Sequence, residues 1–331
     1  MTEIIPGIYQ LELPLPVKAL QYVNIYLIQG DSKCILVDTG LDTEEAFDSL
    51  KKQLAEIGIG FKDITQIIAT HAHGDHYGMA AKLKEVSKAK ISLHHLEKVF
   101  PEAGYLDRDK RFQMIDRWFR LNGAPPFQLA EFQAMPQTRA RLTLPPLPDV
   151  TLQGGEAISV SPFNLQVLWM PGHSPGHISL FEPAHKLLFS GDFILPTITP
   201  NVSLRPQDES NPLGNFINSL KRVRQLDVKL ILPAHGKPFA GLQERADELI
   251  QHHKQRNLEI LGTLDAEPKT AYQIATGIPW IPDKGGVNWQ DLAPLDRRMA
   301  VLETLAHLEY MRFEGRVDKF TKDDTIYYQY T

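Results

Sequence analysis

The chain has 331 residues, 43% of them apolar and 23% charged, which is the ordinary composition of a globular protein with a sizeable core. A formal net charge of -5 excludes a global basic field of the kind that recruits nucleic acid or an anionic membrane surface. The N-terminal residues lack a basic segment followed by an apolar one, and no apolar run approaches 18 residues, so we expect a cytoplasmic protein without a membrane span.

The first two thirds of the chain alternate short apolar runs rich in β-branched residues with stretches of helical periodicity. This order favours a fold in which helices pack outside β layers, because each sheet has to bury its apolar face. The expected strands are Tyr22–Gln29, Cys34–Asp38, Gln66–Thr70, Lys90–His94, Leu165–Met170, Ile178–Phe181, Leu187–Ser190 and Lys229–Leu232. The expected helices are Thr43–Ile57, Asp75–Ser87 and Asn215–Leu226.

Residues 97–150 interrupt this alternation and are expected to form an insertion. Arg108–Leu121 has helical periodicity, so one interpretation is a helical insertion with a small core of its own. A second interpretation is a lid that places an apolar roof over the substrate, and both can hold together. The aromatic residues on which these interpretations depend are Phe100, Tyr105, Phe112, Trp118, Phe119, Phe127 and Phe132.

The segment after Gly241 changes character again and is predicted to form three helices followed by a hairpin. Helix, helix, helix, hairpin is the element order of a winged helix. We therefore expect a first domain over residues 1–240 and a winged-helix-like domain over residues 241–331. The predicted elements are Leu242–Leu264, Thr270–Thr276, Asp296–Glu314, Arg316–Phe320 and Thr325–Tyr330.

The net charge of this last segment indicates whether it can bind nucleic acid. Residues 242–331 hold 11 Lys and Arg against 15 Asp and Glu, a balance of -4. A winged helix that binds nucleic acid presents a basic face, because phosphate contacts supply most of the affinity. We therefore expect that nucleic acid is not a partner and that the apolar face of Asp296–Glu314 packs on the main domain or forms a homodimer.

The strongest chemical signal is the motif Thr70-His71-Ala72-His73-Gly74-Asp75-His76. His71 and His73 are two residues apart in an extended segment, so their imidazoles point to the same side. Asp75 and His76 then open a helix that turns them back towards the same point. Such a cluster, buried and uncompensated, would cost several kcal/mol, and a divalent cation removes that cost. The motif therefore predicts a metal site.

Three later segments each add one ligand-type side chain directly after an apolar strand. They deliver His173, Asp192 and His235 at the carboxyl ends of strands, which is where open α/β sheets place their ligands. Seven nitrogen and oxygen ligands without a cysteine suit two ions of the zinc, manganese or iron type, with one carboxylate bridging them. The cofactor is therefore expected to be two divalent transition-metal ions, with zinc first and manganese or iron as alternatives.

These motifs, in this order, resemble the metallo-β-lactamase superfamily from about Ile8 to Phe239. The resemblance implies an α/β fold, an αββα sandwich with the metals at one edge, and a C-terminal winged helix as in one subfamily. It also implies that Asp38, in Leu36-Val37-Asp38-Thr39-Gly40, lies beneath the metals. The implied ligands are His71, His73 and His173 for the first metal, Asp75, His76 and His235 for the second, and Asp192 as the bridge.

Two ions a few Å apart can share a hydroxide of lowered pKa and polarise a carbonyl or phosphoryl oxygen. Asp75 is then the expected catalytic residue, because it can orient this hydroxide and take up its proton. The chain is therefore predicted to be a hydrolase of a small acyl thioester, ester or lactone. Gly172-His173-Ser174-Pro175-Gly176-His177 resembles hydroxyacylglutathione hydrolases, whereas Leu195 occupies the position where the homoserine lactonases carry a tyrosine.

The alternative function is a metal-dependent endoribonuclease, because the tail resembles a subfamily that includes a mitochondrial ribonuclease branch. The residues that carry this resemblance are Gly191-Asp192-Phe193-Ile194-Leu195, His253 to Leu261, and Leu305-Ala306-His307-Leu308-Glu309.

The remaining titratable side chains have simpler interpretations. Cys34 lies in an apolar run and is expected to be a buried, inert thiol. His94 and His95 end a strand near the motif and are expected to pair with solvent or backbone, with contact to the substrate as the alternative. His177 is expected to be structural. The other histidines, interpreted as surface or interface residues, are His185, His252, His253 and His307.

Overall fold

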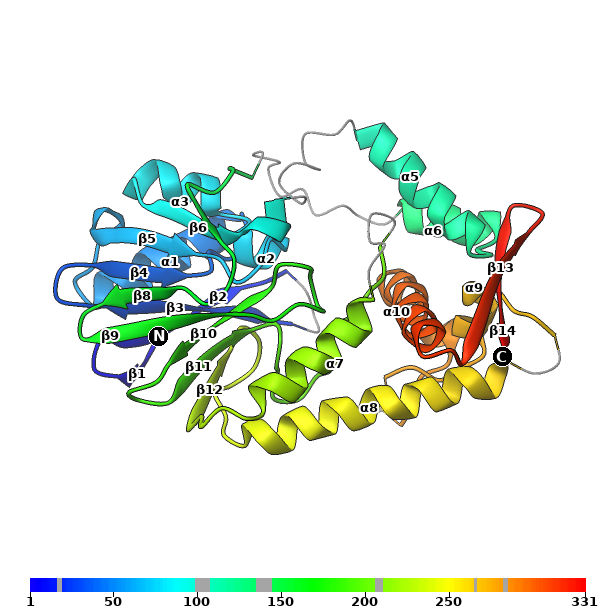
Figure 1. Ribbon diagram of the computed structural model, residues 1–331. Coiled ribbons are helices and arrows are strands. Elements are labelled where there is room, and N and C mark those ends of the chain that lie inside the picture. The colour runs from blue at the N-terminus through cyan, green and yellow to red at the C-terminus, as the bar shows by residue number, and fades with distance from the viewer. Residues whose placement is uncertain (17–19, 99–107, 135–144, 206–210, 265–266, 282–284) are drawn as a thin grey trace. The chain divides into compact units, whose positions relative to one another are not determined.

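The computed structural model describes residues 1–16, 20–98, 108–134, 145–205, 211–264, 267–281 and 285–331 (Figure 1). The side chains of residues 98, 108–112 and 132–134 are not among those described. The chain divides into two compact units, each made of separate segments. The first contains Met1–Tyr105, Arg139–Pro200 and Arg222–Ala246, and the second contains Leu106–Thr138, Asn201–Lys221 and Asp247–Thr331. The predicted domain boundary after residue 240 stays a prediction.

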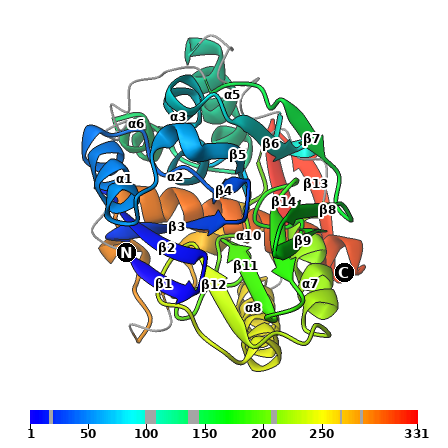
Figure 2. The ribbon, with the colours of Figure 1, turned by 90° about the vertical axis from the view of Figure 1, so that its left-hand side faces the viewer.

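The first unit contains a seven-stranded sheet in which the strands follow one another in chain order. β1 to β4 pair antiparallel, and β4 to β7 pair parallel. In Figure 2 these strands run from dark blue to cyan and green. They are β1 (Thr2–Ile5), β2 (Ile8–Pro14), β3 (Tyr22–Gln29), β4 (Cys34–Val37), β5 (Ile64–Ile68), β6 (Lys90–His94) and β7 (Val150–Leu152).

A five-stranded sheet completes the first unit, in the order β12-β11-β10-β9-β8. β11 and β12 pair parallel, whereas the other neighbours are antiparallel. The strands are β8 (Ala157–Val160), β9 (Phe163–Trp169), β10 (Ile178–Glu182), β11 (Leu187–Gly191) and β12 (Leu230–Pro233). All eight strands that the sequence predicts are present within two residues at each end, whereas β1, β2, β7 and β8 were not predicted.

Apolar side chains on both faces of the first sheet set the layers. Along β3, Ile25 and Leu27 pack with helices α1 (Glu44–Glu56) and α3 (Ala80–Ser87), whereas Tyr26 and Ile28 pack against the second sheet. This alternation follows from the period of two in a strand, and it explains why almost every residue of β3 is buried. The expected αββα sandwich is confirmed. Within the first unit, Arg222, near the end of α7 (Pro212–Val223), donates from Nη2 to the Trp169 carbonyl of β9 at 2.7 Å.

One predicted helix, Asp75–Ser87, is wrong as a single element. The structure has α2 (Gly74–Tyr77) and a separate α3, with an interruption at residues 78 and 79. The His76 carbonyl accepts hydrogen bonds from the backbone N–H and the hydroxyl of Thr39, both at 2.8 Å, so it makes no helical bond. Gly78 is required there, because a Cβ would lie 2.2 Å from the Gly74 carbonyl oxygen. This break lets Asp75 and His76 face the site independently of α3.

The second unit is mainly helical and ends in a hairpin. The buried face of α10 includes Leu305, Leu308 and Met311, and α10 lies against α6, α9 and β13 of the same unit. The predicted order of three helices and a hairpin after Gly241 is present, while the winged-helix interpretation and the homodimer stay predictions. The elements are α5 (Arg108–Leu121), α6 (Pro126–Ala134), α8 (Leu242–Thr263), α9 (Ala271–Thr276), α10 (Pro294–Phe313), β13 (Val317–Lys322) and β14 (Thr325–Tyr330).

The predicted helix Arg108–Leu121 matches α5, and α6 was not predicted. Phe119 is buried and Phe127 is 70% exposed. Residues 106–138 belong to the same compact unit as Asp247–Thr331, so an insertion with a core of its own stays a prediction. Phe100 and Tyr105 lie outside the described residues, as do the side chains of Phe112 and Phe132. The lid therefore stays a prediction. Among the helices described, none is long and apolar enough to cross a membrane.

Candidate metal centre

Three histidine nitrogens meet at one point of the first unit. His71 and His73 follow β5, and His173 follows β9 of the second sheet. The Nε2 atom of His71 lies 2.8 Å from Nδ1 of His73, and Nε2 of His173 lies 3.0 Å from the same Nδ1. Such convergence of imidazole nitrogens is the arrangement that a metal ion requires.

A second cluster lies beside the first. Asp75 and His76 belong to α2, and His235 follows β12. Nε2 of His235 lies 3.2 Å from Oδ2 of Asp75, and Nε2 of His76 lies 3.7 Å from that oxygen. Within each cluster, all candidate ligand atoms lie within 4.8 Å of one another.

Asp192 lies between the two clusters at the end of β11. Its Oδ2 is 3.7 Å from Nε2 of His173, in the first cluster, and 3.4 Å from Nε2 of His76, in the second. Its Oδ1 is 3.4 Å from Nε2 of His235. The structure thus brings all seven predicted ligands together, with one carboxylate reaching both clusters.

Several atoms that face this centre have no hydrogen-bond partner although they are buried. They are Nε2 of His76, Nε2 of His235 and Oδ1 of Asp192. A buried polar atom without a partner costs about 1–3 kcal/mol, and a bound ion removes this cost by accepting the lone pair. The residues present therefore fit divalent metal ions, whose preferred ligands include imidazole and carboxylate.

Contacts behind the imidazoles fix which nitrogen faces the centre. Asp38 Oδ2 accepts a hydrogen bond from Nδ1 of His76 at 2.8 Å, so Nε2 is the nitrogen that faces the centre and would bind an ion in place of a proton. The same carboxylate accepts from the backbone N–H of Thr70 at 2.7 Å and from its hydroxyl at 2.9 Å. Nδ1 of His235 donates to the carbonyl of Tyr22 at 3.2 Å. Asp38 thus lies behind the centre, as the family resemblance implies.

The electrostatic pattern of the centre is set by its carboxylates. Burial alone would lower the pKa of His76, but Asp192, Asp75 and Asp38 together raise it well above its usual value. Burial would raise the pKa of Asp192, but His76 and His235 hold it well below its usual value. The pKa of Asp75 is lowered for the same reason, by His76 and His235 against the effect of burial. These carboxyl groups are therefore ionised and provide the negative charge that a cation needs.

His71 and His177 behave differently because histidines surround them. Burial, and then the neighbouring imidazoles, lower the pKa of both well below the usual value. Nε2 of His177 accepts a hydrogen bond from the backbone N–H of Asp192 at 3.1 Å, which gives His177 the structural role that the sequence predicts. Gly191 is needed at this position, because a Cβ would lie 2.7 Å from that nitrogen.

Two histidine interpretations made from sequence are wrong. His253 and His307 are fully buried inside the second unit and are not surface residues. Nδ1 of His253 lies 3.3 Å from Nε2 of His307, so one hydrogen bond joins the two rings. His94 pairs with backbone as expected, through Nε2 and the Gln153 carbonyl at 3.1 Å. Cys34 is buried and free as expected, and burial raises its pKa to about 11.

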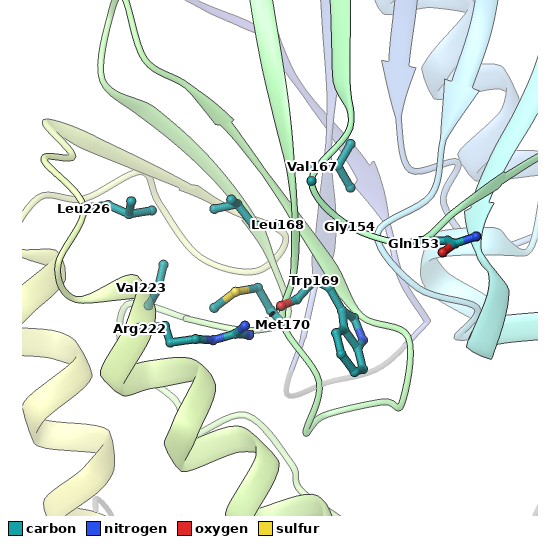
Figure 3. Close-up of a pocket in the computed structure, with 10 residues that line it drawn as sticks. Gln153, Gly154, Val167, Leu168, Trp169, Met170, Arg222, Val223 and Leu226 are labelled. Carbon is teal, nitrogen blue, oxygen red and sulfur yellow. Dashed lines mark hydrogen bonds between the residues drawn. The ribbon is translucent and has the colours of Figure 1, made fainter.

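A pocket of about 380 Å³ lies beside β9, directly before the segment that carries His173 (Figure 3). The Trp169 side chain, 38% exposed, stacks on His94 with ring centroids 5.5 Å apart. Its Nε1 donates to the Pro175 carbonyl at 2.9 Å, so the pocket wall is joined to the His173 loop. The lining residues are Gln153, Gly154, Gly155, Val167, Leu168, Trp169, Met170, Arg222, Val223 and Leu226.

One residue of this region was missed by the sequence motifs. Glu97 is fully buried, and its carboxyl group accepts hydrogen bonds from the backbone of two ligand-carrying loops. The sequence signal for it was an acidic residue shortly after the predicted strand Lys90–His94. Because the insertion was expected to begin at residue 97, Glu97 was assigned to the insertion and not to the site.

Comparisons with known proteins agree with this geometry. The family model described as "Metallo-beta-lactamase superfamily" matches residues 20–235. A solved structure, a metallo-beta-lactamase family protein from Thermus thermophilus, is 33% identical, with a TM-score of 0.83 over 99% of this chain and 100% of that one. The chain belongs to the metallo-β-lactamase superfamily and is a metal-dependent hydrolase.

Two curated relatives are similar over much of their length. The probable metallo-hydrolase YqjP of Bacillus subtilis is 25% identical over 96% of each chain. Acyl-coenzyme A thioesterase MBLAC2 of Gallus gallus is 30% identical over 66% of this chain and 74% of its own.

Proposed function

We propose that this chain hydrolyses acyl thioesters at a centre of two divalent transition-metal ions, with zinc as the first expectation. His71, His73 and His173 would hold one ion, Asp75, His76 and His235 would hold the other, and Asp192 would bridge them. The observation that carries the proposal is the position of Asp192, whose Oδ2 lies 3.7 Å from His173 and 3.4 Å from His76. A single carboxylate that reaches both clusters suits two ions better than one.

The ions, when bound, would lower the pKa of water towards neutrality and polarise the substrate carbonyl. The chain itself supplies the rest. Asp75 is the carboxylate of the second cluster and its side chain is 26% exposed, so it can contact an incoming water. We assign it the role of orienting that water and accepting its proton. Ser174 is buried and its hydroxyl has no hydrogen-bond partner among the residues described, so no base is placed to activate it as a nucleophile.

The thioester class is supported by two observations. The similar Gallus gallus protein is named an acyl-coenzyme A thioesterase. The segment from Gly172 to His177 also resembles hydroxyacylglutathione hydrolases, whose substrates are thioesters. Esters and lactones share the carbonyl chemistry and are secondary candidates. The small acyl compound is the proposed partner.

The test is a substrate panel on one preparation of the full chain. We expect turnover of acyl-coenzyme A thioesters to exceed that of matched oxygen esters and lactones. If an apolar lid covers the acyl group, kcat/KM should rise with chain length, because each buried CH₂ adds about 0.8 kcal/mol. Loss of activity on chelation and its recovery on adding zinc would assign it to the ions.

Single-stranded RNA is the contrasting substrate in the same panel. Metal-dependent RNA cleavage without thioester turnover would replace the proposal by the endoribonuclease alternative. Turnover of thioesters that survives both chelation and the combined His71→Ala and His73→Ala substitutions would show that the activity does not belong to this centre.

A further inference from the structure

A buried glutamate joins two loops of the metal centre. Glu97 lies in a short 3-10 turn, η2 (His95–Lys98), directly after β6, and it is 0% exposed. Its Oε2 accepts a hydrogen bond from the backbone N–H of Ala72 at 2.9 Å. Its Oε1 accepts from the backbone N–H of Gly176 at 2.7 Å. Each oxygen therefore holds a different segment of the chain.

The two segments carry all three histidines of the first cluster. Ala72 lies between His71 and His73, in the loop that follows β5 of the seven-stranded sheet. Gly176 lies three residues after His173, in the loop between β9 and β10 of the five-stranded sheet. The three histidines of the first cluster therefore converge only if these two loops, which belong to different sheets, keep a fixed separation.

Two links join these loops, one before His71 and one between His71 and His73 in the first loop, and both after His173 in the second. Close to the strands, the backbone N–H of Ile178 donates to the Thr70 carbonyl at 2.9 Å. Further out, Glu97 joins Ala72 and Gly176 through its side chain. A carboxyl group whose two oxygens accept from two loops fixes the distance between them, because both hydrogen bonds are short and the carboxyl group itself is buried.

The close approach of the second loop to Glu97 depends on a glycine. A Cβ at Gly176 would lie 2.9 Å from Cγ of Glu97 and 2.7 Å from Nδ1 of His94. Both contacts are shorter than a Cβ tolerates, so an alanine would push the loop away from Glu97. Gly176 therefore offers a second way to break the same link while the carboxyl group stays intact.

We propose that Glu97 is a positioning residue that sets the separation of the His71–His73 loop and the His173 loop, and thereby the affinity of the first metal cluster. This inference rests on the proposed function of the seven residues as metal ligands. Both hydrogen bonds of Glu97 described above go to backbone amides, so it acts through the backbone of the two loops. Residues that orient metal ligands typically contribute tenfold to a hundredfold to metal affinity.

The test compares Glu97→Gln and Gly176→Ala with the wild-type protein and with Glu156→Gln. Glu156 is a matched control, because its carboxylate also accepts two backbone hydrogen bonds, from Gln153 and Gly154, in a loop without ligands. Glutamine keeps the shape of Glu97, but its NH₂ group cannot accept, so one of the two hydrogen bonds is lost.

The first readout is hydrogen exchange at Ala72 and Gly176 in the ion-free protein, which does not depend on metal binding or activity. The second is a Co²⁺ titration followed by visible absorption, with a competing chelator to give the affinity of each step. We expect faster exchange at one or both amides in Glu97→Gln and at Gly176 in Gly176→Ala. We also expect one binding step to weaken by about tenfold to a hundredfold in both variants.

Glu156→Gln should leave both readouts at the wild-type values. Unchanged exchange at both amides, or faster exchange with both Co²⁺ affinities unchanged, would overturn the positioning role. If Glu97→Gln does not fold, as judged by circular dichroism, Gly176→Ala decides the question. A wild-type chain that takes up no Co²⁺ would refute the proposed metal centre, whereas the exchange readout would still report on the link itself.

Discussion

The molecule contains two groups of buried histidines with different chemistry. In the first unit, His76 and His235 face Asp192 and Asp75, and both imidazole Nε2 atoms are buried without a hydrogen-bond partner. In the second unit, Nδ1 of His307 lies 2.7 Å from Oδ1 of Asn257, an amide oxygen that only accepts. His307 Nε2 lies 3.3 Å from Nδ1 of His253, and Nε2 of His253 is buried without a hydrogen-bond partner, so the contrast between the two groups lies in the carboxylates that face the first one.

The difference shows what turns buried histidines into a metal centre. The pKa values of His253 and His307 are lowered first by burial and then by the neighbouring imidazoles and Arg256. The pKa of His76 is raised, against the effect of burial, by Asp192, Asp75 and Asp38. Imidazoles among carboxylates provide both lone pairs and negative charge for a cation, whereas imidazoles that bond to an amide and to each other form a structural link.

The largest expected effect is on the carboxylate-rich group. Combined His71→Ala and His73→Ala substitutions remove two of the three imidazoles of the first cluster. We expect at least one metal ion per chain to be lost and hydrolysis to fall to background, because three protein ligands are the usual minimum of a catalytic site. Elemental analysis and thioester turnover on the same sample measure both. Full metal content in this variant would show that the ions bind elsewhere.

The next effect separates metal binding from proton transfer. Asp75→Asn keeps the shape of the side chain but removes its ability to take up a proton. We expect kcat to fall by about a hundredfold or more, which is typical for the loss of a positioned acid or base. The comparison is meaningful only where the variant holds two ions, so metal content is measured alongside. Turnover near the wild-type value with both ions bound would remove Asp75 from the mechanism.

A third effect concerns the histidine pair of the second unit and depends on pH. The folded-state pKa of His253 is about 3, against 6.5 for the free side chain, because burial disfavours its charged form. Between these values the unfolded chain binds more protons than the folded one, so stability falls as the pH falls below 6.5. Each pH unit in this window removes about 1.4 kcal/mol for this histidine.

The measurement is the free energy of unfolding in denaturant at several pH values between 7 and 5, for wild type and His253→Leu. The variant loses the hydrogen bond to His307 and is expected to be less stable at pH 7. Its stability should then fall less steeply with acid, by about one proton fewer. Equal slopes for the two proteins would mean that His253 titrates normally in the folded chain.

The smallest expected effect tests whether the two groups of buried histidines really differ in metal binding. The same His253→Leu protein should hold as many metal ions per chain as wild type, because its pair bonds to an amide and to no ion. Elemental analysis of both proteins, purified together, checks this. Loss of one ion in this variant would show that the second group of histidines also binds metal. Neighbouring carboxylates would then not be what separates a metal centre from a structural histidine pair.

Local sequence patterns were sufficient to find the seven residues that converge. His71 and His73 share a side because a strand repeats every two residues, and His173, Asp192 and His235 each follow an apolar strand. Such signals need only a few neighbouring residues. The pairing of strands in two layers then brings the four segments to one edge.

The features that were missed depend on contacts between distant residues. The helix after Asp75 is interrupted because the His76 carbonyl bonds to Thr39, far away in sequence. The role of Glu97 depends on its hydrogen bonds to the backbone of Ala72 and Gly176, which are distant from it in the chain, one before it and one after it. His253 and His307 resembled surface residues because their partners are on different helices. The second unit also gathers three separate segments, a grouping that no local pattern reports.

The pairing of β6 with β7 has a consequence for how such an enzyme can change over evolution. The two strands pair in parallel, Ser92 with Val150 and His94 with Leu152, so residues 95–149 are the crossover that joins them. None of the seven ligands lies in this crossover, and the free energy of loop closure depends only weakly on chain length. We therefore expect that changes of length between Glu97 and β7 leave the register of the two strands and the positions of the ligands unchanged. Substrate preference can then diverge between relatives through this crossover, without a change of the catalytic centre.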